Sequence, residues 1–307
     1  MKRNSFLSIS ICIAAILKCA SAHACLHFEK SYKYELKQGT EAAFLFHDGK
    51  YAHLIIKTDL SSPNGELPKV LAWVMPFPTM PIKYEEVDKA VFYELGSIAK
   101  PPRPIVRGAT AQGIEAKLLS AETPSSIRVH EAQVVGNYKI QPIEILSVSD
   151  GKEFNDWLTE HQFNSMPLEK QRPYLHQGAV FLAIKANLSG KSAELKPIHI
   201  VYPADRVSLP LRFTHDARTL DLDLFIFSDQ QLAGKSLDIK YFHKTAQGFY
   251  ETKWSSFRSS HLNSLLKVPM GYVTLFQAKG LNDSEHRLAD LKEDPGFSAQ
   301  DLIPPSH

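Results

Sequence analysis

The stretch from residue 53 to residue 84 constrains the fold of this chain more than any other. Two apolar runs, 54–56 and 70–75, lie on either side of a segment rich in serine, proline, asparagine and glycine. Apolar and β-branched residues bounded by turn formers are typical of paired strands. Three prolines follow the second run, at Pro76, Pro78 and Pro81. Because proline has no amide hydrogen to donate, we predict a β-hairpin whose second strand ends at these prolines or lies at a sheet edge.

A second segment resembles the first. Residues 56–67 and 184–195 align without a gap and are identical at six of twelve positions. We interpret them as two copies of one hairpin unit; the alternative is a chance similarity between two ordinary hairpins. The expected fold is therefore α+β and β-rich, with antiparallel sheets or a sandwich built on two related β-hairpin units and a few packed helices.

Residues 1–24 have the features of a secretory signal peptide. A basic start is followed by an apolar run over 6–17 and by small residues at Ala22 and Ala24, a pattern typical of export and cleavage. An uncleaved membrane anchor is the alternative. No later stretch is long and apolar enough to cross a bilayer. We predict export to the periplasm, cell envelope or medium, with an unknown envelope or extracellular partner.

Cleavage after Ala24 changes the charge and the cysteine count. Basic residues fall from 35 to 32 against 33 acidic residues, so the mature chain is nearly neutral. Without a dense basic stripe, we expect no binding to nucleic acid. Two of the three cysteines leave with the signal. Because Cys25 is then alone, stability must come from core burial rather than from an internal disulfide.

The predicted organisation has four parts. After the signal peptide comes a first β-rich half over 25–135, which contains the hairpin and its Pro-rich exit. A second β-rich half follows over 136–280, with a helix at 151–162 and the repeated hairpin. The last part is a charged, Pro-rich tail over 281–307. A further amphipathic helix is expected from Glu85 to about Gly96, because apolar residues recur every fourth position there.

Several motifs resemble an uncharacterised exported bacterial family, known as domain of unknown function 2330. The resemblance rests on 71–78, 136–138, 156–158, Tyr174, 181–185, Leu195, Pro197 and 210–212. It covers roughly 25–215 and implies export, a β-rich body and no established activity. Family members typically start the mature chain with two or more cysteines and often end in a membrane helix, whereas this chain has only Cys25 and no such helix. The family supplies no catalytic residues.

Motifs for common catalytic chemistry are absent. The sequence has no Gly-x-Ser-x-Gly elbow, no His-Glu-x-x-His and no phosphate-binding glycine loop. We therefore predict no catalytic residues and no cofactor. Asp221 and Asp223 share one face of a predicted strand, which we interpret as a solvated face rather than a calcium site.

Two aromatic residues near the Pro-rich exit are candidate binding residues. Trp73 and Phe77 could present a stacking surface to a ligand, although core packing is the main expectation for Trp73. Phe77 lies between two prolines and is the better candidate for an exposed contact.

The candidate metal ligands are Cys25, His27, His47 and His53. A free Cys25-Leu26-His27 terminus offers an amine, two amides and an imidazole, the square-planar set that copper or nickel accepts. The alternative for Cys25 is lipidation, although the usual leucine three residues before it is missing. His47 and His53 flank an Asp-Gly turn, a strong hairpin signal, and imidazoles there could bind zinc or copper.

These observations favour a non-catalytic envelope or secreted module that binds or assembles with a partner. The alternative is a secreted or periplasmic hydrolase or metal-dependent enzyme, with a site assembled from dispersed His, Asp and Glu residues. A cluster of such residues in one deep cleft would favour the enzyme, and a broad apolar patch near Phe77 would favour the binder.

Overall fold

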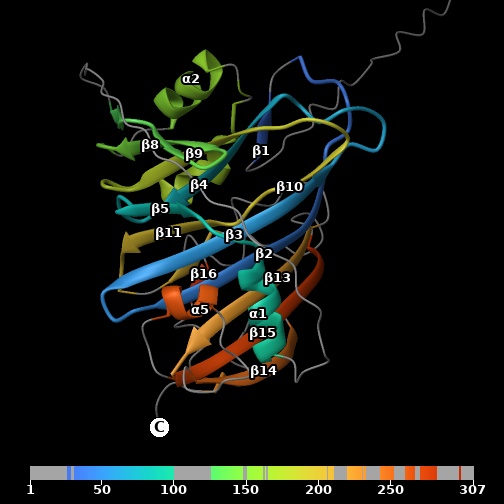
Figure 1. Ribbon diagram of the computed structural model, residues 1–307. Coiled ribbons are helices and arrows are strands. Elements are labelled where there is room, and N and C mark those ends of the chain that lie inside the picture. Colours follow the sequence, from blue (N-terminus) through green and yellow to red (C-terminus); the bar gives the residue numbers. More distant parts are fainter. Residues whose placement is uncertain are drawn as a thin grey trace, which may run out of the picture.

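Two stacked β-sheets form the body of the protein in the computed structural model (Figure 1). The structure describes residues 26–28, 31–99, 126–147, 151–161, 163, 165–205, 207–210, 220–229, 231–232, 243–251, 260–266, 270–281 and 297–298. The predicted signal peptide and tail therefore lie mostly outside the described residues. Within these ranges the protein is β-rich with a few helices, as the sequence predicts.

The first sheet, called sheet A, has six strands. Its order is β1 (Leu26–Phe28), β4 (Val70–Phe77), β9 (Val180–Asn187), β8 (Tyr138–Ile145) and β6 (Ile127–Val129), and β7 (Gln133–Val135) also pairs with β8. All of these pairs are antiparallel. Sheet A lies at the top of Figure 1, with α2 (Lys152–Glu160) above it.

The second sheet, called sheet B, has eight strands. Its order is β14 (His243–Glu251), β15 (Met270–Leu281), β13 (Leu220–Ser228), β2 (Lys37–His47), β3 (Tyr51–Ser61), β11 (Ile198–Pro203) and β5 (Lys83–Glu86), and β10 (Ser192–Glu194) also pairs with β3. Only the β13–β2 pair is parallel among these described strands. A small third sheet joins β12 (Ser208–Leu209) to β16 (Phe297–Ser298).

The remaining described elements are helical. They are α1 (Ala90–Ala99), α3 (Leu168–Gln171), the 3-10 helix η1 (Arg172–Tyr174) and α5 (Ser260–Leu265). No described helix has the length and apolar character needed to span a membrane.

The predicted hairpins are wrong in their pairing. Strands β3 and β4 are present where the apolar runs lie, but they belong to different sheets. The same is true of β9 and β11 in the second copy. Residues 52–56 and 71–77 are buried without alternation, so each run is covered on both faces. Such a run shows that a strand is central without showing which strand it pairs with.

Each copy is instead an arch that contributes one strand to each sheet. The two arches pair reciprocally, because β3 lies beside β11 in sheet B and β4 lies beside β9 in sheet A. Their connecting segments are also in contact. The Ser62 amide donates to the Lys191 carbonyl at 2.8 Å, and the Leu67 amide donates to the Gly190 carbonyl at 2.7 Å. Whether the two copies share one origin stays a prediction.

Pro76, the first of the three prolines, lies within β4 and fits the geometry of sheet A. Strand β4 continues through Pro76, which pairs with Phe181 of β9. On its other side β4 meets only β1, which covers residues 71–73. Pro76 therefore lies beyond the reach of β1, at the edge position that a residue without an amide hydrogen tolerates.

Two apolar cores surround sheet B. The larger core fills the space between the two sheets and continues under α2, with Trp73, Phe154 and Phe181 among its residues. The smaller core lies on the other face of sheet B, where Val91 and Leu95 of α1 and Leu262 of α5 pack on Phe44 and neighbouring strands. Burial of this kind is the main source of stability in a domain without disulfides.

The predicted helix from Glu85 to Gly96 is displaced. Glu85 and Glu86 lie in β5, and α1 begins only at Ala90, whose amide hydrogen is accepted by the Asp88 carboxylate at 2.8 Å. Asp88 therefore provides the cap that an N-terminal helix turn needs. The helix continues past Gly96 to Ala99 because Ile98 and Ala99 still pack in the smaller core. In contrast, α2 lies within the predicted helix 151–162.

Candidate functional site

Four side chains form a row on the outer face of sheet B. The Nδ1 atom of His53 lies 2.9 Å from the Nε2 atom of His199, although the two residues are 146 positions apart. Asp48 continues the row at one end, with a carboxylate oxygen 3.2 Å from His53 Nε2. Glu85 lies at the other end, 3.8 Å from His199 Nδ1. We call these four residues the histidine row.

Local sequence explains how the row is assembled. Asp48 belongs to the β2–β3 turn, where its carboxylate accepts the amide hydrogens of Lys50 and Tyr51 at 2.8 and 2.7 Å. Gly49 has a φ of 93°, which glycine adopts at no steric cost. The predicted Asp-Gly turn is therefore confirmed. Sheet pairing then places His199 of β11 opposite Glu85 of β5.

Burial and neighbouring charges set the protonation of the row. Burial, followed by the adjacent imidazole of His199, lowers the pKa of His53 to about 4. A hydrogen-bonding interaction with His199 is the largest influence on Glu85 and lowers its pKa. Burial opposes this effect, and Lys83 adds to it, so that the pKa of Glu85 falls to about 2. Partial burial raises the pKa of Asp48. Hydrogen bonds from the amides of Tyr51 and Lys50, together with His53, outweigh this effect, so the pKa of Asp48 is lowered. Near neutral pH His53 is therefore uncharged and both carboxylates are ionised.

The ring nitrogens of the row are enclosed. His53 and His199 are 8% and 3% exposed, and the ring of Phe46 stacks on His53 with 4.2 Å between centroids. The His53 Nε2 and His199 Nδ1 atoms are buried, and neither makes a well-aligned hydrogen bond to its carboxylate. The row joins its two imidazoles and encloses their remaining nitrogens beside Asp48 and Glu85, so these nitrogens are not exposed to a substrate or a metal ion.

His47 is also occupied by the protein itself. Its Nε2 atom lies 2.7 Å from the Ala204 carbonyl, and its Nδ1 atom accepts the Gly49 amide hydrogen at 3.1 Å. The structure therefore places the predicted metal ligands His47 and His53 near one turn, each with other partners. Among the described residues, no three His, Cys, Asp or Glu side chains are grouped in a way that would hold a metal ion.

The other predicted site residues are placed as follows. Trp73 and Phe77 lie in β4 and are 1% and 3% exposed. Trp73 therefore packs in the core as expected, whereas the expectation that Phe77 is exposed is wrong, because both side chains belong to the larger core. A contact of either side chain with a ligand stays a prediction. His27 lies in β1 opposite Ala72. Cys25 lies outside the described residues. Its lipidation and its role as a metal ligand therefore stay predictions.

A second cluster lies on the outer face of sheet A, and sequence reasoning missed it. Lys185 of β9 is half-buried, with its ammonium group 4.8 Å from the ring centroid of Phe163 and 5.7 Å from that of Trp157. Lys139 of β8 is directly opposite Lys185 in the sheet. We call Lys185, Lys139, Trp157 and Phe163 the lysine–aromatic cluster. The available signal was a lysine inside the apolar run of β9.

The cluster contains two positive charges and no matching carboxylate. Within the described part of the chain, the ammonium group of neither Lys185 nor Lys139 makes a hydrogen bond or an ion pair. Burial, followed by the charge of Lys139, lowers the pKa of Lys185. Like charges at directly opposed positions destabilise a sheet, so this arrangement costs stability.

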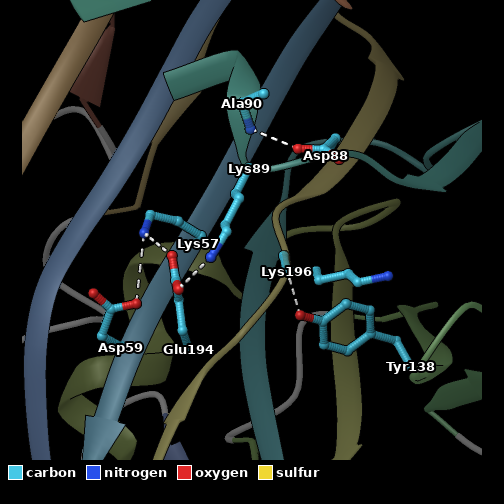
Figure 2. A network of polar contacts seen from close by, with 8 residues as sticks. All are labelled: Lys57, Asp59, Asp88, Lys89, Ala90, Tyr138, Glu194 and Lys196. Atoms are coloured by element: carbon cyan, nitrogen blue, oxygen red, sulfur yellow. Dashed lines mark hydrogen bonds and ion pairs between the residues drawn. The ribbon is translucent and has the colours of Figure 1, made fainter. Parts of the chain in front are cut away.

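A third polar network ties elements together around Glu194 (Figure 2). Its carboxylate lies 3.1 Å from the ammonium group of Lys57 in β3 and 2.8 Å from that of Lys89, just before α1. Nearby, the Tyr138 hydroxyl donates to the Lys196 carbonyl at 2.5 Å. Glu86 accepts hydrogen bonds from Lys196 at 2.6 Å and from the Asn137 amide at 3.0 Å. These contacts link sheet A to sheet B and leave no unpaired charge.

The fold defines a β-rich α+β protein built mainly on two large sheets. The chain belongs to the bacterial family described as "Uncharacterized protein conserved in bacteria (DUF2330)", whose model matches residues 19–285. This match confirms the resemblance that the sequence motifs indicate.

Two further comparisons add little. No curated protein sequence matches the chain. Among solved structures, the crystal structure of baculovirus P35 is similar, with a TM-score of 0.36 and 12% sequence identity over 81% of this chain and 93% of that one. At this level the likeness supports no functional argument.

Proposed function

We propose that the protein is exported and acts outside the cytoplasm as a non-catalytic module that binds a partner. The observation that supports this function best is the lysine–aromatic cluster. It holds two lysines on the outer face of sheet A with no carboxylate partner among the described residues, an arrangement suited to binding rather than to packing. The signal-like sequence of residues 1–24 supports export.

The enclosed histidine row also favours a binding module. A general base must come within hydrogen-bond reach of the proton that it removes. The free nitrogens of His53 and His199 are buried against the protein's own carboxylates. The rival function, a hydrolase or metal-dependent enzyme, would require this part of sheet B to open if its site used these histidines.

Intact mass tests export. The full chain, carrying a C-terminal tag, is expressed in a bacterial host and purified from cytoplasmic and envelope fractions. We expect the protein in the envelope or medium without residues 1–24. A full-length protein confined to the cytoplasm would overturn export. The same spectrum decides the state of Cys25, because an acyl chain adds mass.

Affinity capture tests binding. The purified mature protein serves as bait for solubilised envelope material, and the double variant Lys139→Met, Lys185→Met serves as the matched control. A partner retained by the native bait and lost by the variant supports the proposal. Equal capture by both baits removes the cluster from it.

A further inference from the structure

The lysine–aromatic cluster has the composition of an anion site. We infer that Lys185 and Lys139 together bind an oxyanion, either a phosphate or a carboxylate group, on the outer face of sheet A. This inference deepens the proposed function and rests on the same cluster. It is tested separately on the purified protein, so that export and anion binding can fail independently.

The two lysines lie close together in sheet A. Strand pairing sets Lys139 and Lys185 opposite each other on the face that α2 partly covers. Side chains opposed in this way have Cβ atoms about 5 Å apart. Two ammonium groups on flexible stems at that spacing can close on one oxyanion from two sides.

Two aromatic rings orient the ammonium group of Lys185. Trp157 follows Phe154, which stacks on Phe181 of β9 with 4.4 Å between centroids, so α2 is fixed on the sheet. The rings of Trp157 and Phe163 then attract the ammonium group of Lys185 through cation–π contacts. Such contacts orient the charge without using an acceptor. The N–H donors of Lys185 therefore remain available to a ligand.

Lys57 and Lys185 have different surroundings, although they occupy aligned positions in the two similar segments. Lys57 has carboxylate oxygens of Glu194 and Asp59 at 3.1 and 3.5 Å. Lys185 has no such neighbour among the described residues, although it is also half-buried. An external anion would supply the charge that Glu194 supplies to Lys57.

Burial strengthens the argument. The lowered pKa of Lys185 reflects burial and repulsion from Lys139. The negative charge of a bound anion would stabilise the ammonium form of Lys185 against both effects and raise this pKa again. Binding and the protonation of Lys185 are therefore coupled, which gives the experiment a second readout.

The experiment titrates inorganic phosphate and acetate into the isotope-labelled mature protein at constant pH and ionic strength. Amide and lysine side-chain NMR signals are followed. We expect saturable shifts of amides in 139–141 and 183–187, and a rise of the Lys185 pKa at saturation. The anion that binds more tightly identifies the source as a phosphorylated or a carboxylated ligand.

Five variants make the test specific. Lys185→Met and Lys139→Met should each weaken binding at least tenfold, whereas Lys185→Arg should change it less than threefold. Phe163→Leu should weaken binding without changing the net charge, because it loosens Lys185. Lys191→Met, which removes the same charge from an exposed connecting segment, should leave binding unchanged.

Three outcomes would overturn the inference. One is the absence of saturable shifts with both anions. Another is equal weakening by Lys191→Met, which would indicate general attraction of anions. The third is unchanged binding in Lys185→Met. A melt of each variant separates loss of the site from loss of the fold.

Discussion

At the scale of single residues, the most unusual side chain is Glu41. It lies in β2 opposite Thr58 of β3 and faces the core between the sheets. Its Oε2 atom accepts a hydrogen bond from Gln38 at 3.0 Å, whereas its Oε1 atom and the Thr58 hydroxyl are buried and have no hydrogen-bond partner among the described residues. Burial, opposed by the Gln38 hydrogen bond, raises the pKa of Glu41 to about 8. Glu41 is therefore mainly protonated at neutral pH.

This protonation predicts a loss of stability at alkaline pH. The unfolded chain releases the Glu41 proton near its ordinary pKa of 4.5, whereas the folded chain keeps it until about pH 8. The folded state then binds more protons, so the free energy of unfolding falls as pH rises from about 4.5 to about 8. Glu41→Gln should flatten this dependence in denaturant unfolding at pH 5, 7 and 9. The exposed Glu66→Gln is the control, and an unchanged slope in Glu41→Gln would contradict the assignment.

His53 predicts the opposite dependence. Its folded pKa of about 4 lies below its ordinary value of 6.5, so the unfolded chain binds the proton first. The free energy of unfolding should therefore fall as pH falls from about 6.5 to about 4. Because Glu85 and Asp48 also respond below about pH 4.5, unfolding is measured at pH 7, 6 and 5.

The variant His53→Gln isolates this effect. It should reduce the slope between pH 7 and pH 5, since no imidazole titrates at that position. His176→Gln, in the connection before β9, is the matched control and should keep the native slope. A native slope in His53→Gln would remove the histidine row as the source of acid sensitivity.

At the scale of elements, β4 is the central strand of the larger core. Trp73 lies in the middle of it and is 1% exposed. Trp73→Ala should lower the free energy of unfolding by about 3–5 kcal/mol, because it removes a large buried side chain and leaves a cavity. Denaturant or thermal unfolding measures the change. Tyr93→Ala on α1, where the side chain is 65% exposed, should cost much less, and an equal midpoint for native and Trp73→Ala protein would contradict the core role.

Elements are also where the sequence informs most and misleads most. Apolar runs located β3, β4, β9, β11 and β13 because strand formation depends on local side chains. Their partners could not be predicted, because a strand buried on both faces has the same pattern in either sheet. The contact between His53 and His199 arises from the β3–β11 pairing and was missed for that reason. Lys185 was missed because a lysine in a strand is usually solvated, and only the fold places it between two aromatic rings.

At the scale of the whole molecule, both sheets combine strands from the two predicted halves. In sheet A, β4 of the first half lies between β1 and β9, and in sheet B, β3 pairs with β11. A fragment of residues 25–135 therefore lacks β9, the longer partner of β4, and β11, one of the two strands beside β3. We predict that this fragment is unfolded alone, with poorly dispersed amide NMR signals.

Complementation provides the matching control. The fragment 136–307 supplies β9 and β11, so mixing or coexpressing the two fragments should restore dispersed signals. A separately folded 25–135 would contradict the reciprocal pairing of the arches and would support independent domains instead.

The reciprocal pairing of the arches also limits how early in synthesis the protein can fold. Sheet A lacks a strand until β9 ends at Asn187, and sheet B lacks one until β15 ends at Leu281. High contact order of this kind slows folding, because long loops must close before their contacts contribute. The fold therefore cannot be completed until most of the chain has been synthesised, a property compatible with the export proposed above.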